Sequence, residues 1–145
     1  MTKRRTLLAA GGFMLLLRPA WGTPESLRAA IDAFTGGAPV RNGRVTLTID
    51  PLVENGNAVP VSVSVQSPMT PADHVQRIAI FTPQNPLPEV AVFHLSPASG
   101  RALVSTRMRM ATTQPVIALA VMSDGSAWQH NVNVVVTLAA CLEGG

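Results

Sequence analysis

The feature that most limits the fold of this chain is an alternation of apolar and polar residues that recurs from residue 44 to residue 138. A two-residue period places every second side chain on the same face of a β-strand. The alternation is clearest at Val45, Leu47 and Ile49, with polar residues between them. Seven segments fit strands, at residues 44–50, 59–65, 74–81, 90–95, 102–110, 115–122 and 128–138. Seven short strands in about 100 residues predict an all-β domain, an antiparallel β-sandwich of immunoglobulin type.

Turn sequences separate the predicted strands. Asn55-Gly56-Asn57 and Ser123-Asp124-Gly125-Ser126 are typical of tight turns. The chain contains one cysteine, so no disulfide can join the two sheets of the sandwich. A β-barrel is the alternative architecture, whereas the helical segments are too few for an α/β sheet.

One short helix precedes the strands. Thr23 can cap it, Pro24 suits its first position, and Glu25 favours the positive end of the helix dipole. Apolar residues then recur at helical spacing, and two glycines end the pattern at residues 36–37. We expect this helix to pack on the β-domain.

The first 22 residues have the three parts of a signal peptide. A basic start containing Arg4 and Arg5 precedes an apolar run, and Ala20-Trp21-Gly22 offers small residues for cleavage. The apolar run, residues 7–17, is shorter than the roughly 17–25 residues that a membrane-spanning helix needs. The paired arginines favour the twin-arginine export route, and general secretion is the alternative route. An uncleaved membrane anchor is the alternative interpretation of the whole segment. The predicted organisation is a signal peptide at 1–22, a β-sandwich with its lead-in helix at 23–138, and a flexible arm at 139–145.

The basic charge of the chain belongs to this leader. Four of the 11 Lys and Arg residues lie within residues 1–18, whereas all eight acidic residues lie beyond Thr23. The exported part therefore has seven basic and eight acidic residues, a formal net charge of −1. A chain of this balance has no basic face for nucleic acid and no polybasic patch for a membrane. We expect neither as a partner after signal cleavage, when the protein would be periplasmic.

The sequence lacks the common motifs of enzymes and metal sites. It contains no Gly-x-Ser-x-Gly motif and no phosphate-binding loop. A copper site of two histidines, a cysteine and a methionine is conceivable from His74, His94, His130 and Cys141. Copper sites in β-sandwiches typically cluster such ligands in one C-terminal loop, and no histidine or methionine follows Cys141. We therefore favour three ordinary histidines and predict no metal and no cofactor. Methionines such as Met108 are expected to fill the core.

Cys141 is the one group with evident chemistry. A lone cysteine in an exported chain indicates either an intermolecular bond or a free reactive thiol. It follows the last predicted strand, in a short terminal segment of the kind that is usually exposed and mobile. That segment is the predicted arm, formed by Ala139, Ala140, Cys141, Leu142, Glu143, Gly144 and Gly145.

Five stretches between residues 27 and 141 resemble the SoxY family of sulfur-carrier proteins in order and spacing. They are Thr35-Gly36-Gly37, Glu54-Asn55-Gly56-Asn57-Ala58-Val59-Pro60, Phe93-His94-Leu95-Ser96-Pro97-Ala98-Ser99-Gly100, Val104-Ser105-Thr106-Arg107-Met108-Arg109 and Met122-Ser123-Asp124-Gly125-Ser126. A twin-arginine leader is also usual in that family.

The resemblance implies a carrier of thiosulfate oxidation that is not itself an enzyme. SoxY proteins pair with a second β-sandwich, SoxZ, and present a C-terminal cysteine on a flexible arm. SoxXA joins thiosulfate oxidatively to that cysteine, SoxB releases sulfate, and a sulfane dehydrogenase, where present, oxidises the remaining sulfur. Cys141 matches the carrier cysteine, and its chemistry is disulfide-like exchange and oxidation at sulfur.

The arm departs from the family pattern, which is typically Gly-Gly-Cys-Gly-Gly. Ala139 and Ala140 replace the preceding glycines and restrict the backbone, while Leu142 and Glu143 add bulk and charge after the cysteine. An alternative hypothesis is therefore a divergent SoxY-like binding module that does not carry sulfur.

Overall fold

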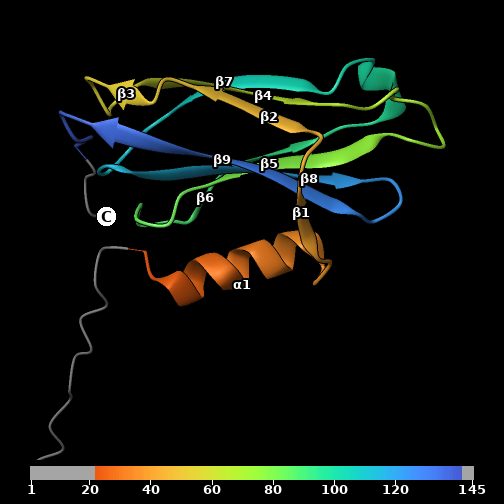
Figure 1. Cartoon of the computed structure of the whole chain (residues 1–145), viewed down its shortest axis with the longest axis horizontal. Helices are drawn as coiled ribbons and strands as arrows, with labels where there is room; N and C mark the ends of the chain where they lie inside the picture. The colour runs from red at the N-terminus through yellow and green to blue at the C-terminus, as the bar shows by residue number, and fades with distance from the viewer. Residues whose placement is uncertain (1–21, 142–145) are drawn as a thin grey trace, which may run out of the picture.

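The structure is a computed structural model that describes residues 22–141 (Figure 1). These residues form an α-helix, a short 3₁₀ helix and nine strands. The elements are α1 (Pro24–Thr35), β1 (Val40–Asn42), β2 (Val45–Ile49), β3 (Leu52–Val53), β4 (Val59–Val65), β5 (Val75–Phe81), β6 (Glu89–His94), η1 (Pro97–Ser99), β7 (Leu103–Met108), β8 (Gln114–Met122) and β9 (Ala127–Val136). The predicted leader with Arg4 and Arg5, apart from Gly22, lies outside the described residues, as do Leu142, Glu143, Gly144 and Gly145. Within the described part, no helix is long and apolar enough to cross a membrane.

The strands form two facing sheets, which confirms the predicted sandwich (Figure 1). The larger sheet has the order β1-β9-β8-β5-β6, and β3 joins it beside β9. The smaller sheet has the order β2-β4-β7. Pairs within the body of both sheets are antiparallel.

Two short strands, β1 and β3, share the edge of β9 that faces away from β8. Strand β1 pairs in parallel with the beginning of β9, and β3 pairs in parallel with its end. Between them the chain crosses to the smaller sheet to form β2. All seven predicted strands are present, whereas β1 and β3 were not predicted because three and two residues are too few to show a period.

The last predicted strand extends too far. Strand β9 ends at Val136, two residues before the predicted end at residue 138, and Leu138 is 62% exposed. The strand stops because the backbone beyond Val136 turns to bond with other segments, described below.

Apolar side chains from both sheets meet in the main core. Strand β4 shows the expected alternation, with its odd-numbered valines buried and Ser64 exposed. Burial of these faces is the main force that holds the sheets together. Met108 and Met110 are buried in this core, as the sequence predicts.

Helix α1 covers the opposite face of the larger sheet (Figure 1). Phe34 packs edge-on against Phe81 of β5 with ring centroids 5.8 Å apart. The Arg77 Nη2 donates a 2.8 Å hydrogen bond to the Phe34 carbonyl near the end of the helix. Strands β5 and β8 are therefore buried on both faces, which explains why their sequences are almost continuously apolar.

The helix begins where the sequence predicts. The Thr23 hydroxyl accepts the Ser26 N–H at 3.1 Å, and the Ser26 hydroxyl accepts the Thr23 N–H at 3.0 Å. This reciprocal pair satisfies two donors that the helix cannot use internally. Gly36 ends the helix in the left-handed region, at φ 66°.

The main core predicts a large effect for Ile78→Ala. Ile78 has no exposed surface, so removing its side chain loses transfer energy and leaves a cavity. We expect the free energy of unfolding to fall by about 2–5 kcal/mol in urea denaturation. Val135→Ala, at a side chain 48% exposed, is the control and should change it by less than about 0.5 kcal/mol. Equal losses in the two variants would contradict this description of the core.

Candidate functional site

Cys141 is exposed and follows strand β9, which ends at one end of the sandwich (Figure 1). Its backbone N–H donates a 2.9 Å hydrogen bond to Oδ1 of Asn57, a residue 84 positions earlier in the chain. The end of the described chain is therefore tied to the turn before β4. Ala139 is exposed and Ala140 is half-buried.

Residues 137–140, between β9 and the cysteine, follow the segment that contains β3. The Thr137 N–H donates to the Val53 carbonyl at 3.0 Å, and its hydroxyl donates to the Glu54 carbonyl at 3.2 Å. The Leu138 carbonyl then accepts the Gly56 N–H at 2.8 Å. This ladder prolongs the pairing of β3 with β9 and directs the chain toward the turn at residues 55–57.

Gly56 lies where three backbone segments meet. Its carbonyl accepts the Met110 N–H at 2.8 Å, and the Met110 carbonyl accepts the Ala140 N–H at 3.0 Å. A Cβ at position 56 would lie 2.7 Å from the Met110 carbonyl oxygen and 2.9 Å from the Ala140 nitrogen. The glycine is needed for this close approach. We call residues 55–57 with Met110 the arm clasp.

A buried pair of amides fixes the backbone on both sides of Met110. The Asn85 Oδ1 accepts the Ala111 N–H at 2.9 Å and the Gln114 Nε2–H at 2.8 Å, while its Nδ2 donates to the Arg109 carbonyl at 2.8 Å. Asn85 is 9% exposed and Gln114 is 3% exposed. Buried amides with satisfied partners hold a unique backbone path. This network places the Met110 N–H and carbonyl where Gly56 and Ala140 use them.

Three exposed apolar side chains lie beside the clasp. Leu52 and Val135 are register partners across the β3–β9 pair, and both are about half exposed. Leu138, which bonds to Gly56 through its carbonyl, is also exposed. Leu52 also lines a shallow hollow of about 500 Å³, together with Asp50 and Glu54. Exposed apolar side chains near the clasp suit contact with another protein.

The histidines do not gather around Cys141. The His130 Nδ1 accepts the Leu47 N–H at 2.9 Å, a bond between the two sheets. His74 precedes β5 beside the β8–β9 turn, and His94 ends the neighbouring strand β6. Residues 22–141 contain no group of three His, Cys, Asp or Glu side chains arranged to hold a metal.

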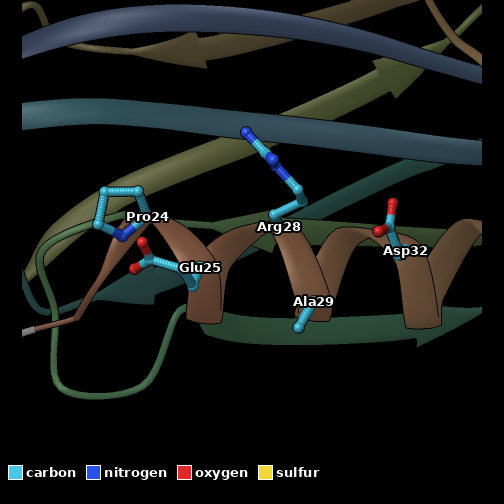
Figure 2. A pocket seen from close by; sticks show the side chains of 5 residues that line it. All are labelled: Pro24, Glu25, Arg28, Ala29 and Asp32. Atoms are coloured by element: carbon cyan, nitrogen blue, oxygen red, sulfur yellow. The ribbon is translucent and has the colours of Figure 1, made fainter.

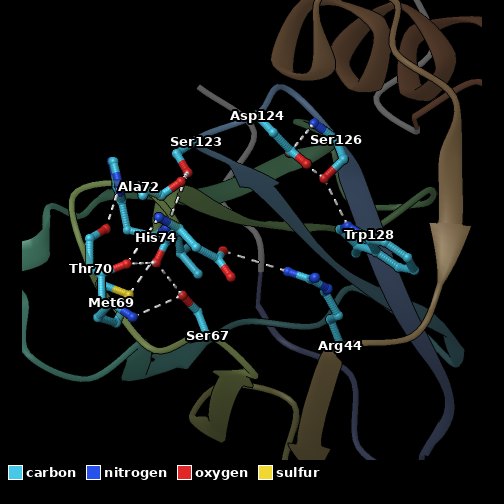
Figure 3. Close-up of polar contacts among 12 residues, drawn as sticks. Arg44, Ser67, Met69, Thr70, Ala72, His74, Ser123, Asp124, Ser126 and Trp128 are labelled. Carbon is cyan, nitrogen blue, oxygen red and sulfur yellow. Dashed lines mark hydrogen bonds and ion pairs between the residues drawn. The ribbon is translucent and has the colours of Figure 1, made fainter.

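The polar residues of the turn at 123–126 stabilise the turn itself, and this accounts for their presence (Figure 3). The Asp124 Oδ1 accepts the Ser126 hydroxyl at 2.6 Å and the Ser126 N–H at 2.9 Å, and these bonds hold the pKa of Asp124 below its usual value. The Ser126 hydroxyl accepts the Trp128 Nε1–H at 3.0 Å. Arg44 lies over the Trp128 ring and also approaches the Asp73 carboxylate at 3.8 Å.

A second hollow, of about 250 Å³, lies along helix α1 (Figure 2). Its charged side chains are Glu25, Arg28 and Asp32, and all three are exposed. Charges at this spacing on a solvated helix are ordinary surface features. The hollow therefore adds no chemistry to the site around Cys141.

Sequence reasoning found Cys141 and missed the residues that hold it. Asn55, Gly56 and Asn57 were assigned to a turn, which they form, but their contacts with Met110 and residues 138–141 were not predicted. Asn85 and Gln114 were not identified at all. No local pattern signals these contacts, because they join segments that are far apart in sequence.

Comparison with known proteins gives a family match over most of the chain. The model of the family described as sulfur oxidation protein SoxY matches residues 31–141, ending on the cysteine. The sulfur carrier protein SoxY from Chlorobium limicola f thiosulfatophilum is 32% identical, with a TM-score of 0.67 over 79% of this chain and 98% of that one.

Other similar structures show the fold alone. A superoxide reductase (neelaredoxin) from Ignicoccus hospitalis is 15% identical, with a TM-score of 0.58 over 81% of this chain and 95% of that one. A putative superoxide reductase from Thermotoga maritima is 19% identical, with a TM-score of 0.55 over 71% of this chain and 89% of that one. No curated protein matches the chain.

Gly56→Ala should disturb the residues that precede the cysteine. The added methyl group collides with backbone atoms, so we expect a loss of about 1–3 kcal/mol in unfolding free energy and faster hydrogen exchange of the Ala140 amide. Gly100→Ala is the control, because position 100 has open space but a left-handed φ of 73°. The control should lose stability through backbone strain while exchange at Ala140 stays as in the parent chain. Unchanged exchange in Gly56→Ala would contradict the clasp.

Proposed function

The chain belongs to the SoxY family of sulfur oxidation proteins, and we propose that it carries sulfur intermediates of thiosulfate oxidation covalently on Cys141. The observation that supports this assignment is the place of the cysteine. Cys141 is the only cysteine of the chain, it is exposed, and it is the last residue of the family match. An exposed thiol at the end of a domain can enter the active site of another protein.

The proposed chemistry has two steps. In the first, the Cys141 thiolate forms an S–S bond with the outer sulfur of thiosulfate, and two electrons leave to a haem partner of the SoxXA type. In the second, a partner of the SoxB type adds water to the terminal sulfonate. The S–S bond to that sulfonate breaks, sulfate and two protons are released, and a persulfide remains on Cys141. A sulfane dehydrogenase would oxidise this persulfide further.

The carrier contributes position to these steps, and the partners contribute catalysis. Around Cys141 the described contacts come from backbone groups and the neutral amide of Asn57. A neutral amide acts as neither a general acid nor a general base at ordinary pH. We therefore propose that the chain is not itself an enzyme and uses no cofactor beyond the sulfur that it carries.

A SoxZ-type β-sandwich is the proposed stable partner, and the periplasm is the proposed location. The exposed pair Leu52 and Val135, and the exposed Leu138 that bonds to Gly56, support a protein contact near the clasp, because exposed apolar side chains can mark such contacts. The leader sequence with Arg4 and Arg5 supports export.

A second candidate is a SoxY-like binding module that does not carry sulfur. The observation that favours it is the composition of the arm, in which Ala139 and Ala140 precede the cysteine and Leu142 and Glu143 follow it. Such a module would keep the sandwich and its partner surface, and would use Cys141 for an intermolecular disulfide or not at all.

The carrier proposal predicts the behaviour of Cys141→Ser. Because Cys141 is exposed and its described bond uses the backbone, the variant should keep its unfolding free energy within about 0.5 kcal/mol. It should lose all sulfur loading when mixed with thiosulfate and the redox partner, as measured by mass spectrometry. Loading that survives the substitution would exclude Cys141 as the attachment site.

A displaced thiol is the matched control. Ser64→Cys in the Cys141→Ser background places an exposed thiol on the outer face of β4. We expect no enzymatic loading of this variant, although small reagents should alkylate its thiol. Equal loading of the two thiols would show that position is unimportant. Failure of the parent chain itself to load would favour the binding module.

A further inference from the structure

We propose that Asn57 is a positioning residue for Cys141, which it holds through the cysteine backbone in a docked state that can release without loss of the fold. The inference concerns the site of the proposed function and takes its biological meaning from it. The hydrogen bond between Asn57 and the Cys141 backbone does not depend on any group attached to the thiol.

The orientation of the Asn57 amide is set by its neighbour. The Asn55 Oδ1 accepts the Asn57 backbone N–H at 3.0 Å and the Asn57 Nδ2–H at 3.1 Å. With Nδ2 directed at Asn55, the Oδ1 of Asn57 is free to accept, and it receives the Cys141 N–H at 2.9 Å. Asn55, Asn57 and Cys141 are thus joined by two consecutive hydrogen bonds that run from the turn to the cysteine.

The turn does not need the Asn57 side chain for its own shape. The bond from the Asn57 backbone N–H to Asn55 is an Asx-type turn, which any residue at position 57 can form. The Gly56 backbone supplies the contacts with Leu138 and Met110. Among the described contacts, the amide oxygen of Asn57 bonds to Cys141 alone. The Asn57 side chain is therefore not needed for the turn, and it bonds to the residue that carries the thiol. This indicates that Asn57 has its role at Cys141.

The bond is suited to opening. Both Asn57 and Cys141 are exposed, and a single exposed hydrogen bond shifts an equilibrium by roughly two- to tenfold. The Ala140 N–H bonds to a different acceptor, the Met110 carbonyl, so opening of the Cys141 bond does not itself break that contact. Release therefore starts at the sulfur-bearing residue and leaves β9 in place.

Hydrogen exchange and alkylation of the full mature chain test this role without any partner enzyme. In Asn57→Ala, the amide of Cys141 should exchange roughly two- to tenfold faster, because its acceptor is gone. In Asn57→Asp, an acceptor oxygen is retained with a negative charge beside the thiol. A nearby anion disfavours the thiolate, so the pH profile of Cys141 alkylation should move to higher pH.

Asn42→Asp is the matched control for charge. Asn42 is exposed and pairs with Gln129, at the opposite end of β9 from Val136. Gln129 and Val136 are seven positions apart along the strand, a distance of roughly 23 Å, which exceeds a Debye length of about 8 Å at physiological salt. This variant changes the net charge equally and should leave the alkylation profile where it is in the parent chain.

Two results would overturn the proposal. One is exchange of the Cys141 amide that is the same in Asn57→Ala and the parent chain. The other is an Asn57→Asp alkylation profile that coincides with that of Asn42→Asp. If Asn57→Ala fails to fold, the profile of Asn57→Asp decides. Neither readout involves sulfur loading, so a cysteine that docks without loading would refute the carrier role alone.

Discussion

The close contact of Gly56 with Met110 and the chain after β9 is the constraint on which the candidate site depends. Three backbone segments approach one another there, with hydrogen bonds at 2.8 to 3.0 Å and no space for a Cβ. The buried amides of Asn85 and Gln114 fix one of these segments from behind. Because a buried, fully bonded backbone has few alternative arrangements, the position of Cys141 is set by the body of the domain.

Strand β9, near the edge of the larger sheet, leads directly into the segment that makes this contact. Strand β9 pairs with β8 over residues 127–134, and short strands β1 and β3 pair with the two ends of its other edge. Pairing at both ends shortens the edge that remains open to other chains. The reactive residue then follows a rigid strand by only a few residues. A rigid base and a releasable end would suit the proposed delivery of a bound sulfur intermediate to partner enzymes.

The sequence predicts the parts of this structure that have local causes. Helix α1 has its cap and stop signals, and the seven longer strands have their periods, so both were found. Strands β1 and β3 are too short to show a pattern, and the last strand was extended to Leu138 because alternation alone does not reveal where a strand ends. The role of Asn57 is invisible locally, since its partner lies 84 residues away. Cys141 was singled out because a lone cysteine is conspicuous, whereas the clasp joins segments that are far apart in sequence.

The central claim is that Cys141 bears sulfur, and the intact mass of the mature protein tests it most directly. The protein would be purified from its native periplasm during growth on thiosulfate and measured before and after a thiol reductant. The account predicts a sulfur or thiosulfonate adduct that maps to Cys141 and disappears on reduction. An unmodified thiol, or only a disulfide-linked dimer through Cys141, would contradict the carrier role and leave family membership as a statement about ancestry and fold.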